Sequence, residues 1–316
     1  MNSILTAREL FVAQQGPLKL RWLAGQGGAE RLLEPATARY PGMALVGHLN
    51  YVHPNRVQIL GSAEVEYLRR LPDAEHEQAL DNLFRCPTTT IVVVANAETV
   101  DPDLIAAADA ADLPLLVTPL GSPQIIDHLQ HYLTRSLAEK TVQHGVFLEV
   151  MGLGVFITGE SGSGKSEVAL ELLSRGHRLI ADDAVEFSRT GPDVLIGRCP
   201  RMLRDFLEVR GLGILNVRAM FGDTAVRPEK TLRLIVCLQP LTPERMAKID
   251  RLQVEQKTRT LLDVDIPEVL LYVAPGRNLA VLVETATRAH ILRMRGINPL
   301  EELIRRQQDS MSGKSP

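Results

Sequence analysis

The chain has 316 residues, 45% of them hydrophobic, which allows about two soluble domains of ~100–200 residues each. Its 35 lysines and arginines nearly balance its 38 acidic residues, and the net charge of -3 excludes a global basic surface for nucleic acid or an anionic membrane. Three cysteines at unrelated spacings, no signal-peptide pattern in residues 1–30 and no apolar run of ~18 residues lead us to expect a cytoplasmic protein with reduced thiols.

The first half contains one βαβ pattern. Residues 90–96 (TIVVVAN) and 113–120 (LPLLVTPL) have the composition of buried strands, and residues 100–112 between them form a helical pattern opened by Asp101 and Pro102. We therefore expect an α/β domain over residues 1–130, with a role in regulation or assembly.

Residues 122–143 have apolar side chains at helical spacing, with Ser122 as a good cap and Pro123 as a good first helical residue. We expect this helix to join the two halves, with residues 131–143 as the linker. A catalytic domain is predicted over residues 144–309, followed by a flexible tail at 310–316.

The second half begins with a phosphate-binding motif. Residues 144–158 predict two short strands broken at Gly152 and Gly154, and a helical pattern over 167–176 ends at Gly176. Between them, GESGSGKS matches G-x-x-x-x-G-K-[ST] at every fixed position. The predicted nucleotide loop consists of Gly159, Glu160, Ser161, Gly162, Ser163, Gly164, Lys165 and Ser166.

Each part of this loop has a physical role in the prediction. Gly159 and Gly164 permit backbone conformations in which successive N–H groups point at phosphate oxygens, and the following helix adds its positive dipole end. Lys165 would hold the β- and γ-phosphates and Ser166 would ligate Mg²⁺. The alternative is a glycine- and serine-rich turn that matches by chance.

Asp182 and Asp183 follow the next predicted strand, in HRLIADD (177–183). One helix and a tight turn bring the chain back to a strand of the same direction, so its carboxyl end should lie beside the loop. One carboxylate could meet Mg²⁺ and the other could accept a proton from an attacking hydroxyl. The alternative is that the pair only ends the strand and begins a turn.

Residues 206–222 (FLEVRGLGILNVRAMFG) place Glu208 and Arg210 on the same face if the segment is a strand. A bulged strand with a surface ion pair explains them equally well. A GTPase is the rival, because AKID (247–250) approaches the guanine-reading pattern N/T-K-x-D. Ala247 replaces the required side chain and no D-x-x-G follows the loop at a suitable place, so we interpret this match as chance.

Residues 284–310 predict two helices separated by residues 296–299.

Taken together, residues 144–187, 207–222, IDRL (249–252) and PGRNLAVLVETA (275–286) resemble the HPr kinase/phosphorylase family. These bacterial enzymes phosphorylate and dephosphorylate a serine of the phosphocarrier protein HPr and regulate carbon metabolism. Residues 40–61 resemble the family's N-terminal domain.

The resemblance implies a small N-terminal α/β domain and a P-loop kinase domain with a mixed β-sheet flanked by helices. It also implies ATP and Mg²⁺, inorganic phosphate and pyrophosphate in the reverse reaction, HPr as partner, a homo-hexamer, and neither nucleic acid nor membrane as a partner.

The resemblance also assigns site residues. Lys165 would bind the phosphates, Ser166 and Glu208 would ligate Mg²⁺, and Asp183 would be the base that takes the serine proton and returns it in reverse. His144 would lie beside Asp183, although alone it could equally be a strand-edge histidine bonded to backbone. Arg251 and Arg277 would stabilise the transferring phosphoryl group, although on sequence alone they fit solvated surface charges.

One departure concerns the segment before Arg277. The family pattern PV[KR]PGR has a basic residue where this chain has Ala274. That segment is associated with dephosphorylation in the family, so we rank the kinase direction first. A small-molecule kinase and a nucleotide-binding switch remain as alternative functions.

Overall fold

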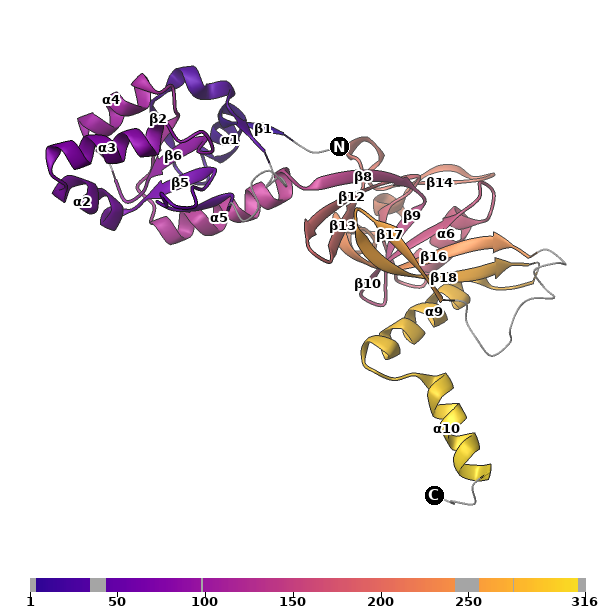
Figure 1. The fold of residues 1–316 in the computed structure, drawn as a ribbon. Helices are drawn as coiled ribbons and strands as arrows, with labels where there is room; N and C mark the ends of the chain where they lie inside the picture. Colours follow the sequence, from indigo (N-terminus) through magenta and orange to yellow (C-terminus); the bar gives the residue numbers. More distant parts are fainter. Residues whose placement is uncertain (1–3, 35–43, 98, 242–255, 275, 312–316) are drawn as a thin grey trace. The chain divides into compact units, whose positions relative to one another are not determined.

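The computed structural model describes residues 4–34, 44–97, 99–241, 256–274 and 276–311 (Figure 1). The chain forms two compact units, Met1–Glu139 and Lys140–Pro316. Each contains its own β-sheet with helices packed against it, which confirms the predicted α/β class and the presence of an N-terminal and a C-terminal domain. Within the described ranges, no helix combines the length and apolar character needed to cross a membrane.

A five-stranded sheet in the order β2-β7-β6-β5-β4 forms the centre of the first unit. Strands β4 (Val46–His48), β5 (Val57–Leu60), β6 (Ile91–Val94) and β7 (Leu115–Val117) are parallel, and β2 (Arg21–Ala24) is antiparallel to β7. Strands β1 (Leu5–Thr6) and β3 (Leu32–Leu33) form a separate pair. The predicted βαβ unit is confirmed, since α4 (Pro102–Ala110) connects the parallel neighbours β6 and β7.

Helices cover both faces of this sheet because successive strand residues point to opposite sides. Ile91 and Val93 pack in one core with α1 (Ala7–Gln14) and α5 (Ser122–Ser136). Val92 and Val94 pack in a second core with α2 (Ser62–Arg70), α3 (Asp73–Phe84) and α4. A short 3₁₀ helix, η1 (Gln26–Glu30), completes the unit.

The helix expected over 122–143 differs from the structure. Helix α5 ends at Ser136, and its apolar face, formed by Ile125, Leu129 and Leu133, is fully buried in the core of the first unit. Glu139–His144 then form strand β8. The segment expected to be a linker helix is therefore the end of a core helix followed by a strand of the second unit.

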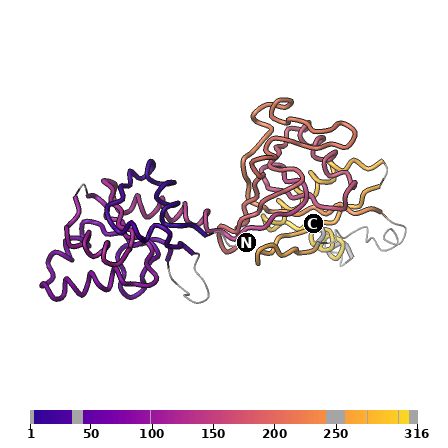
Figure 2. The backbone as a smooth tube through the Cα atoms, turned by 90° about the horizontal axis from the view of Figure 1, so that it is seen from above, coloured from indigo at the N-terminus to yellow at the C-terminus, as the bar shows by residue number. Residues whose placement is uncertain are grey.

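The second unit is built on a nine-stranded mixed sheet. Its main path is β11-β9-β10-β16-β13-β12-β8, with β18 also paired to β16 and β17 to β18. Figure 2 follows the backbone from a second direction. The bounds are β9 Val146–Val150, β10 Leu153–Gly159, β11 Arg178–Ala181, β12 Ala184–Gly191, β13 Val194–Arg198, β16 Glu229–Pro240, β17 Gln256–Leu261 and β18 Val264–Val273.

The two faces of this sheet carry different cores. Helices α6 (Lys165–Ser174) and α9 (Leu279–Met294) pack in an aliphatic core with β9 and β10. The opposite face holds Phe147, Phe156 and Phe187, whose rings meet edge to face at centroid distances of 5.4 and 5.1 Å around Phe187. The aliphatic face is the one that positions α6 and the loop before it.

The remaining elements lie between and after these strands. They are η2 (Arg201–Leu203), the hairpin β14 (Phe206–Val209) and β15 (Gly213–Asn216), α7 (Val217–Phe221), η3 (Asp223–Ala225) and α10 (Pro299–Met311). The two predicted C-terminal helices are confirmed as α9 and α10. On α10, Leu303 and Ile304 are 46% and 43% exposed.

Candidate active site

The glycine-rich loop connects β10 to α6, as predicted. Gly159, Gly162 and Gly164 have φ angles of +149°, +79° and +86°, which side chains other than glycine rarely adopt. A Cβ at Gly159 would also lie 2.5 Å from the carbonyl oxygen of Leu238 on β16. The loop therefore depends on glycine both for its backbone path and for its close contact with the neighbouring strand.

Lys165 is the first residue of α6 and is only 8% exposed. Its Nζ donates hydrogen bonds to the carbonyl oxygens of Gly159 at 3.0 Å and Glu160 at 2.9 Å. The buried hydroxyl of Ser163 makes no hydrogen bond within the described part of the chain. The loop thus encloses two groups that can bind an anion. One is the Lys165 ammonium, whose described hydrogen bonds go to neutral carbonyl oxygens, and the other is the unpartnered Ser163 hydroxyl.

The two aspartates directly follow strand β11, as the sequence predicted. Strand β9 is antiparallel to both β10 and β11, so β10 and β11 run in the same direction with β9 between them. Their carboxyl ends therefore meet at one edge of the sheet. This topology brings Asp182 and Asp183 beside the glycine-rich loop.

Asp182 and Asp183 are adjacent in the chain but lie in different surroundings. Asp182 is 6% exposed, and its Oδ2 accepts a 2.9 Å hydrogen bond from the backbone N–H of Glu208. Burial raises the pKa of the Asp182 carboxyl, although this backbone hydrogen bond opposes the shift. Asp183 has a left-handed backbone, with φ +64°, and its side chain is 63% exposed.

His144 lies directly against Asp183. Its Nδ1 is 3.0 Å from Asp183 Oδ1, and the backbone N–H of Gly145 donates to the carbonyl oxygen of Asp183 at 3.2 Å. These two contacts join the end of β8 to the turn after β11. The imidazole and the carboxylate are both more than 60% exposed and thus accessible to a large substrate.

A cavity of about 390 Å³ brings the predicted residues together. Its lining includes the predicted loop residues Ser161, Gly162 and Gly164 together with Asp182, and it adds Gly145 and Glu167, which the sequence did not single out. The full lining is His144, Gly145, Ser161, Gly162, Gly164, Lys165, Ser166, Glu167, Asp182, Asp183, Glu208 and Arg210. Carboxylates, an ammonium, a guanidinium and an imidazole therefore surround one opening.

Glu208 and Arg210 reach this cavity from a hairpin rather than from the single strand that was expected. Leu207 and Val209 of β14 are buried in the core, so Glu208 points to the opposite, exposed side. The turn uses Gly211 and Gly213, with φ angles of +84° and +83°. The sequence indicated Arg210 beside Glu208 on one strand face without assigning it a role, whereas Gly145 and Glu167 carry no signal of their own.

Of the two predicted arginines, the structure describes Arg277 but not Arg251. Arg251 and the AKID segment lie outside the described residues. Arg277 is exposed, is not part of the cavity lining, and precedes α9. The start of α9 is nevertheless close to the loop, because a Cβ added to Gly164 would lie 3.9 Å from Leu279 Cδ1.

Comparisons with known proteins agree over both units. A family described as the HPr serine kinase C-terminal domain matches residues 135–307, and one described as the HPr serine kinase N terminus matches residues 5–133. An HPr kinase/phosphorylase from Chromobacterium violaceum is 51% identical over 302 residues, covering 96% of this chain and 94% of the relative. One from Xylella fastidiosa is 48% identical over 317 residues and covers both chains fully.

A solved structure, that of the Hpr(Ser) kinase/phosphatase from Coxiella burnetii, is 37% identical and covers 49% of this chain and 93% of that chain, with a TM-score of 0.46. The two family matches and the full-length relatives show that this chain belongs to the HPr serine kinase family.

Proposed function

We propose that the protein transfers the γ-phosphoryl group of ATP to a serine of HPr, and that it also removes this group by phosphorolysis. The observation that carries the proposal is the His144–Asp183 pair, whose nitrogen and oxygen are 3.0 Å apart, in the same cavity as Lys165 and the glycine-rich loop. A proton acceptor and a phosphate-binding loop at one opening are the two parts that phosphoryl transfer to a hydroxyl needs.

In the forward direction, Asp183 accepts the serine proton as the serine oxygen attacks the γ-phosphorus and the bond to the β,γ-bridging oxygen breaks. ADP leaves and the serine carries the phosphoryl group. The Nζ of Lys165 and the loop N–H groups hold the phosphates, with phosphate oxygens taking the place of the Gly159 and Glu160 carbonyl acceptors. His144 keeps the Asp183 carboxylate directed at the opening.

In the reverse direction, an oxygen of inorganic phosphate attacks the phosphorus of phosphoserine. The bond between phosphorus and the serine oxygen breaks, Asp183 returns the proton to that oxygen, and pyrophosphate forms. The same residues serve both directions because each step passes through the same arrangement of entering and leaving oxygens. Ala274, which replaces the basic residue of the family pattern, leads us to expect the kinase direction to dominate.

Mg²⁺ fits the oxygen-rich lining of the cavity. Ser166 and Glu208 would hold it, and bound Mg²⁺ would neutralise charge on the phosphates. Within the described residues, no group of three or more His, Cys, Asp or Glu side chains could hold a metal.

Further parts of the proposal rest on the family resemblance. Arg251 and Arg277 would stabilise the transferring phosphoryl group. A regulatory or assembly role for the first unit, a cytoplasmic location and a homo-hexamer also stay predictions.

The proposed function is tested by incubating the protein with γ-labelled ATP and purified HPr, then locating the label. We expect labelled phosphoserine, and release of labelled pyrophosphate when labelled HPr is returned to the protein with orthophosphate. Nucleotide binding without labelled HPr would contradict the proposal. In that case, transfer to a small hydroxylated molecule would identify a small-molecule kinase, and no transfer at all a nucleotide-binding switch.

A further inference from the structure

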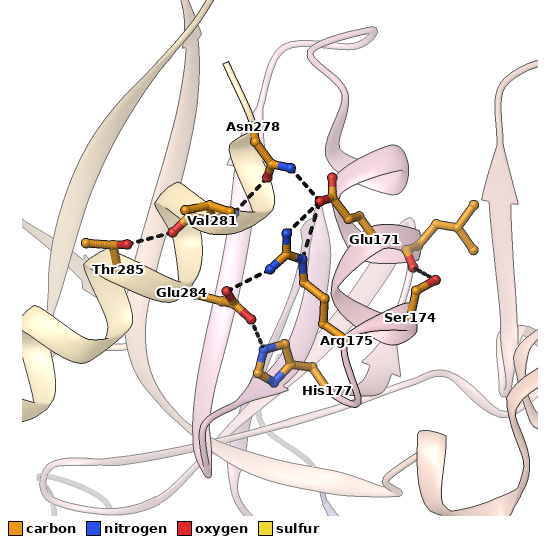
Figure 3. Close-up of polar contacts among 9 residues, drawn as sticks. Glu171, Ser174, Arg175, His177, Asn278, Val281, Glu284 and Thr285 are labelled. Carbon is orange, nitrogen blue, oxygen red and sulfur yellow. Dashed lines mark hydrogen bonds and ion pairs between the residues drawn. The ribbon is translucent and has the colours of Figure 1, made fainter. Parts of the chain in front are cut away.

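A polar cluster joins α6, the helix that follows the glycine-rich loop, to α9 (Figure 3). Glu171 on α6 accepts a hydrogen bond of 2.6 Å from Asn278 Nδ2 and one of 3.1 Å from Arg175. Arg175 also reaches Glu284 of α9 at 3.3 Å. Two helices distant in sequence are thus tied together on the side of α6 that faces α9.

Asn278 has two roles in this cluster. Its Oδ1 accepts a 2.9 Å hydrogen bond from the backbone N–H of Val281, so Asn278 caps the N-terminus of α9. Its Nδ2 simultaneously donates to Glu171. One side chain therefore determines where α9 begins and also attaches that starting point to α6, as Figure 3 shows.

The position of this attachment matters because of its neighbours in the chain. Arg277 directly precedes Asn278, and Leu279, which directly follows it, lies beside Gly164 at the start of α6. Asn278 is thus flanked by an exposed guanidinium on one side and by a contact with the loop on the other. Because Arg277 and Asn278 share a planar peptide bond, holding Asn278 in place restricts where the backbone of Arg277 can lie.

The electrostatics favour an ordered link at this place. The hydrogen bond from Asn278 is the largest cause that lowers the pKa of the Glu171 carboxyl, so Glu171 is a carboxylate that holds its partners at neutral pH. A second tie lies further along α9, where Glu284 accepts from Arg175 and pairs with His177 Nε2 at 2.9 Å. The first tie thus links the N-terminus of α9 to α6, and the second contacts α9 at Glu284, further along the helix.

We propose that Glu171 and Asn278 are positioning residues that fix where Arg277 lies relative to the glycine-rich loop. Neither side chain lines the cavity, so each acts through the backbone at Arg277. This inference rests on the proposed function, in which Arg277 stabilises the transferring phosphoryl group. It goes further by naming the link that sets the distance between that charge and the loop.

The test uses single-turnover transfer of labelled phosphate to HPr at saturating nucleotide, together with nucleotide affinity. Glu171→Ala and Asn278→Ser remove the link, although serine can still cap α9. We expect the transfer rate to fall by about 10- to 100-fold, the cost of a misplaced group, with nucleotide affinity unchanged. Glu171→Gln keeps an acceptor for Asn278 and should restore most of the rate. Thr285→Val, which removes a hydrogen bond within α9 only, is the matched control and should transfer at the wild-type rate.

The decisive comparison repeats Glu171→Ala in an Arg277→Ala background. If Glu171 acts through Arg277, the second substitution changes the rate by less than about twofold, because the two effects are not additive. An equal loss in both backgrounds, no loss in Glu171→Ala, or a wild-type rate in Arg277→Ala alone would each overturn the inference. None of these results contradicts phosphoryl transfer to HPr itself, although a wild-type rate in Arg277→Ala would also remove the role proposed for Arg277. The transfer itself fails as a proposal only if the wild-type protein labels no serine of HPr.

Discussion

The two units build similar sheet edges but equip them differently. In the first unit, a cavity of about 300 Å³ lies at the end of β6, and the guanidinium of Arg69 there binds both oxygens of Asp101 at 2.9 Å. In the second unit, Lys165 at the end of β10 is held only by two carbonyls, and within the described residues it has no carboxylate partner. The ammonium in the second unit is therefore available to an anion, whereas a carboxylate already neutralises the guanidinium in the first unit.

A second contrast lies within the cavity beside the glycine-rich loop. Asp182 is buried and bonded to backbone, whereas Asp183 is exposed and paired with His144. Neighbouring carboxyl groups in different environments can take different roles. Here the exposed one is able to meet a protein substrate, and the buried one anchors the hairpin that carries Glu208.

The largest expected difference between the two units is in the phosphoryl-transfer rate after the cation at each sheet edge is removed. Lys165→Ala is expected to lower phosphoryl transfer by about 10²- to 10³-fold, the usual cost of losing one group that stabilises transition-state charge. Arg69→Ala, the matched substitution in the first unit, should leave transfer within about twofold and lower thermal stability only slightly, because exposed ion pairs contribute little. Steady-state kinetics and thermal unfolding measure both. Equal losses of activity at the two edges would contradict the contrast.

Substitution of His144 tests the separate role of Asp183, the exposed aspartate. His144→Ala should lower transfer by up to about 100-fold, because the Asp183 carboxylate loses the contact that directs it. In an Asp183→Asn background the same substitution should have almost no further effect, since the histidine then has no carboxylate to direct. Additive losses in the double variant would show that His144 acts independently of Asp183.

The smallest expected effect is that of the buried Asp182 carboxyl on the stability of the folded protein. Burial raises its pKa in the folded protein, so the folded state binds the proton more tightly than the unfolded state, and stability falls as the pH rises above the ordinary value of 3.8. Asp182→Asn should therefore raise Tm at neutral pH, corresponding to about 0.5–2 kcal/mol. This gain should shrink on lowering the pH toward 3.8. Calorimetry across this range would reject the idea if the variant were less stable at neutral pH.

The sequence predicted the elements whose signals are local. The strand, glycine-rich loop and helix around Lys165 follow from glycine positions and apolar periodicity, and the returning direction of β11 follows from chain length alone. The end of α5 could not be predicted in this way. Leu137 continues the apolar spacing beyond Ser136, and the polar residues after it suit either a helix or an edge strand. The β14–β15 hairpin was not predicted, because the alternation within residues 206–216 is compatible with one strand and with two.

The individual side-chain contacts needed the three-dimensional structure. The bond from the Glu208 backbone to Asp182 joins residues 26 positions apart, and the link from Asn278 to Glu171 spans 107. Neither leaves a periodic trace in the sequence. Long-range hydrogen bonds of this kind depend on how the sheets and helices pack, which local patterns do not determine.

Asp183, as the group that takes the serine proton, is the residue on which the proposed function depends most. Single-turnover transfer to HPr by Asp183→Asn, measured beside nucleotide affinity, tests this directly. We predict a loss of about 10²- to 10⁴-fold in transfer, the usual contribution of a general base, with nucleotide affinity unchanged. Transfer at the wild-type rate by Asp183→Asn would contradict the account, because an amide cannot accept the proton.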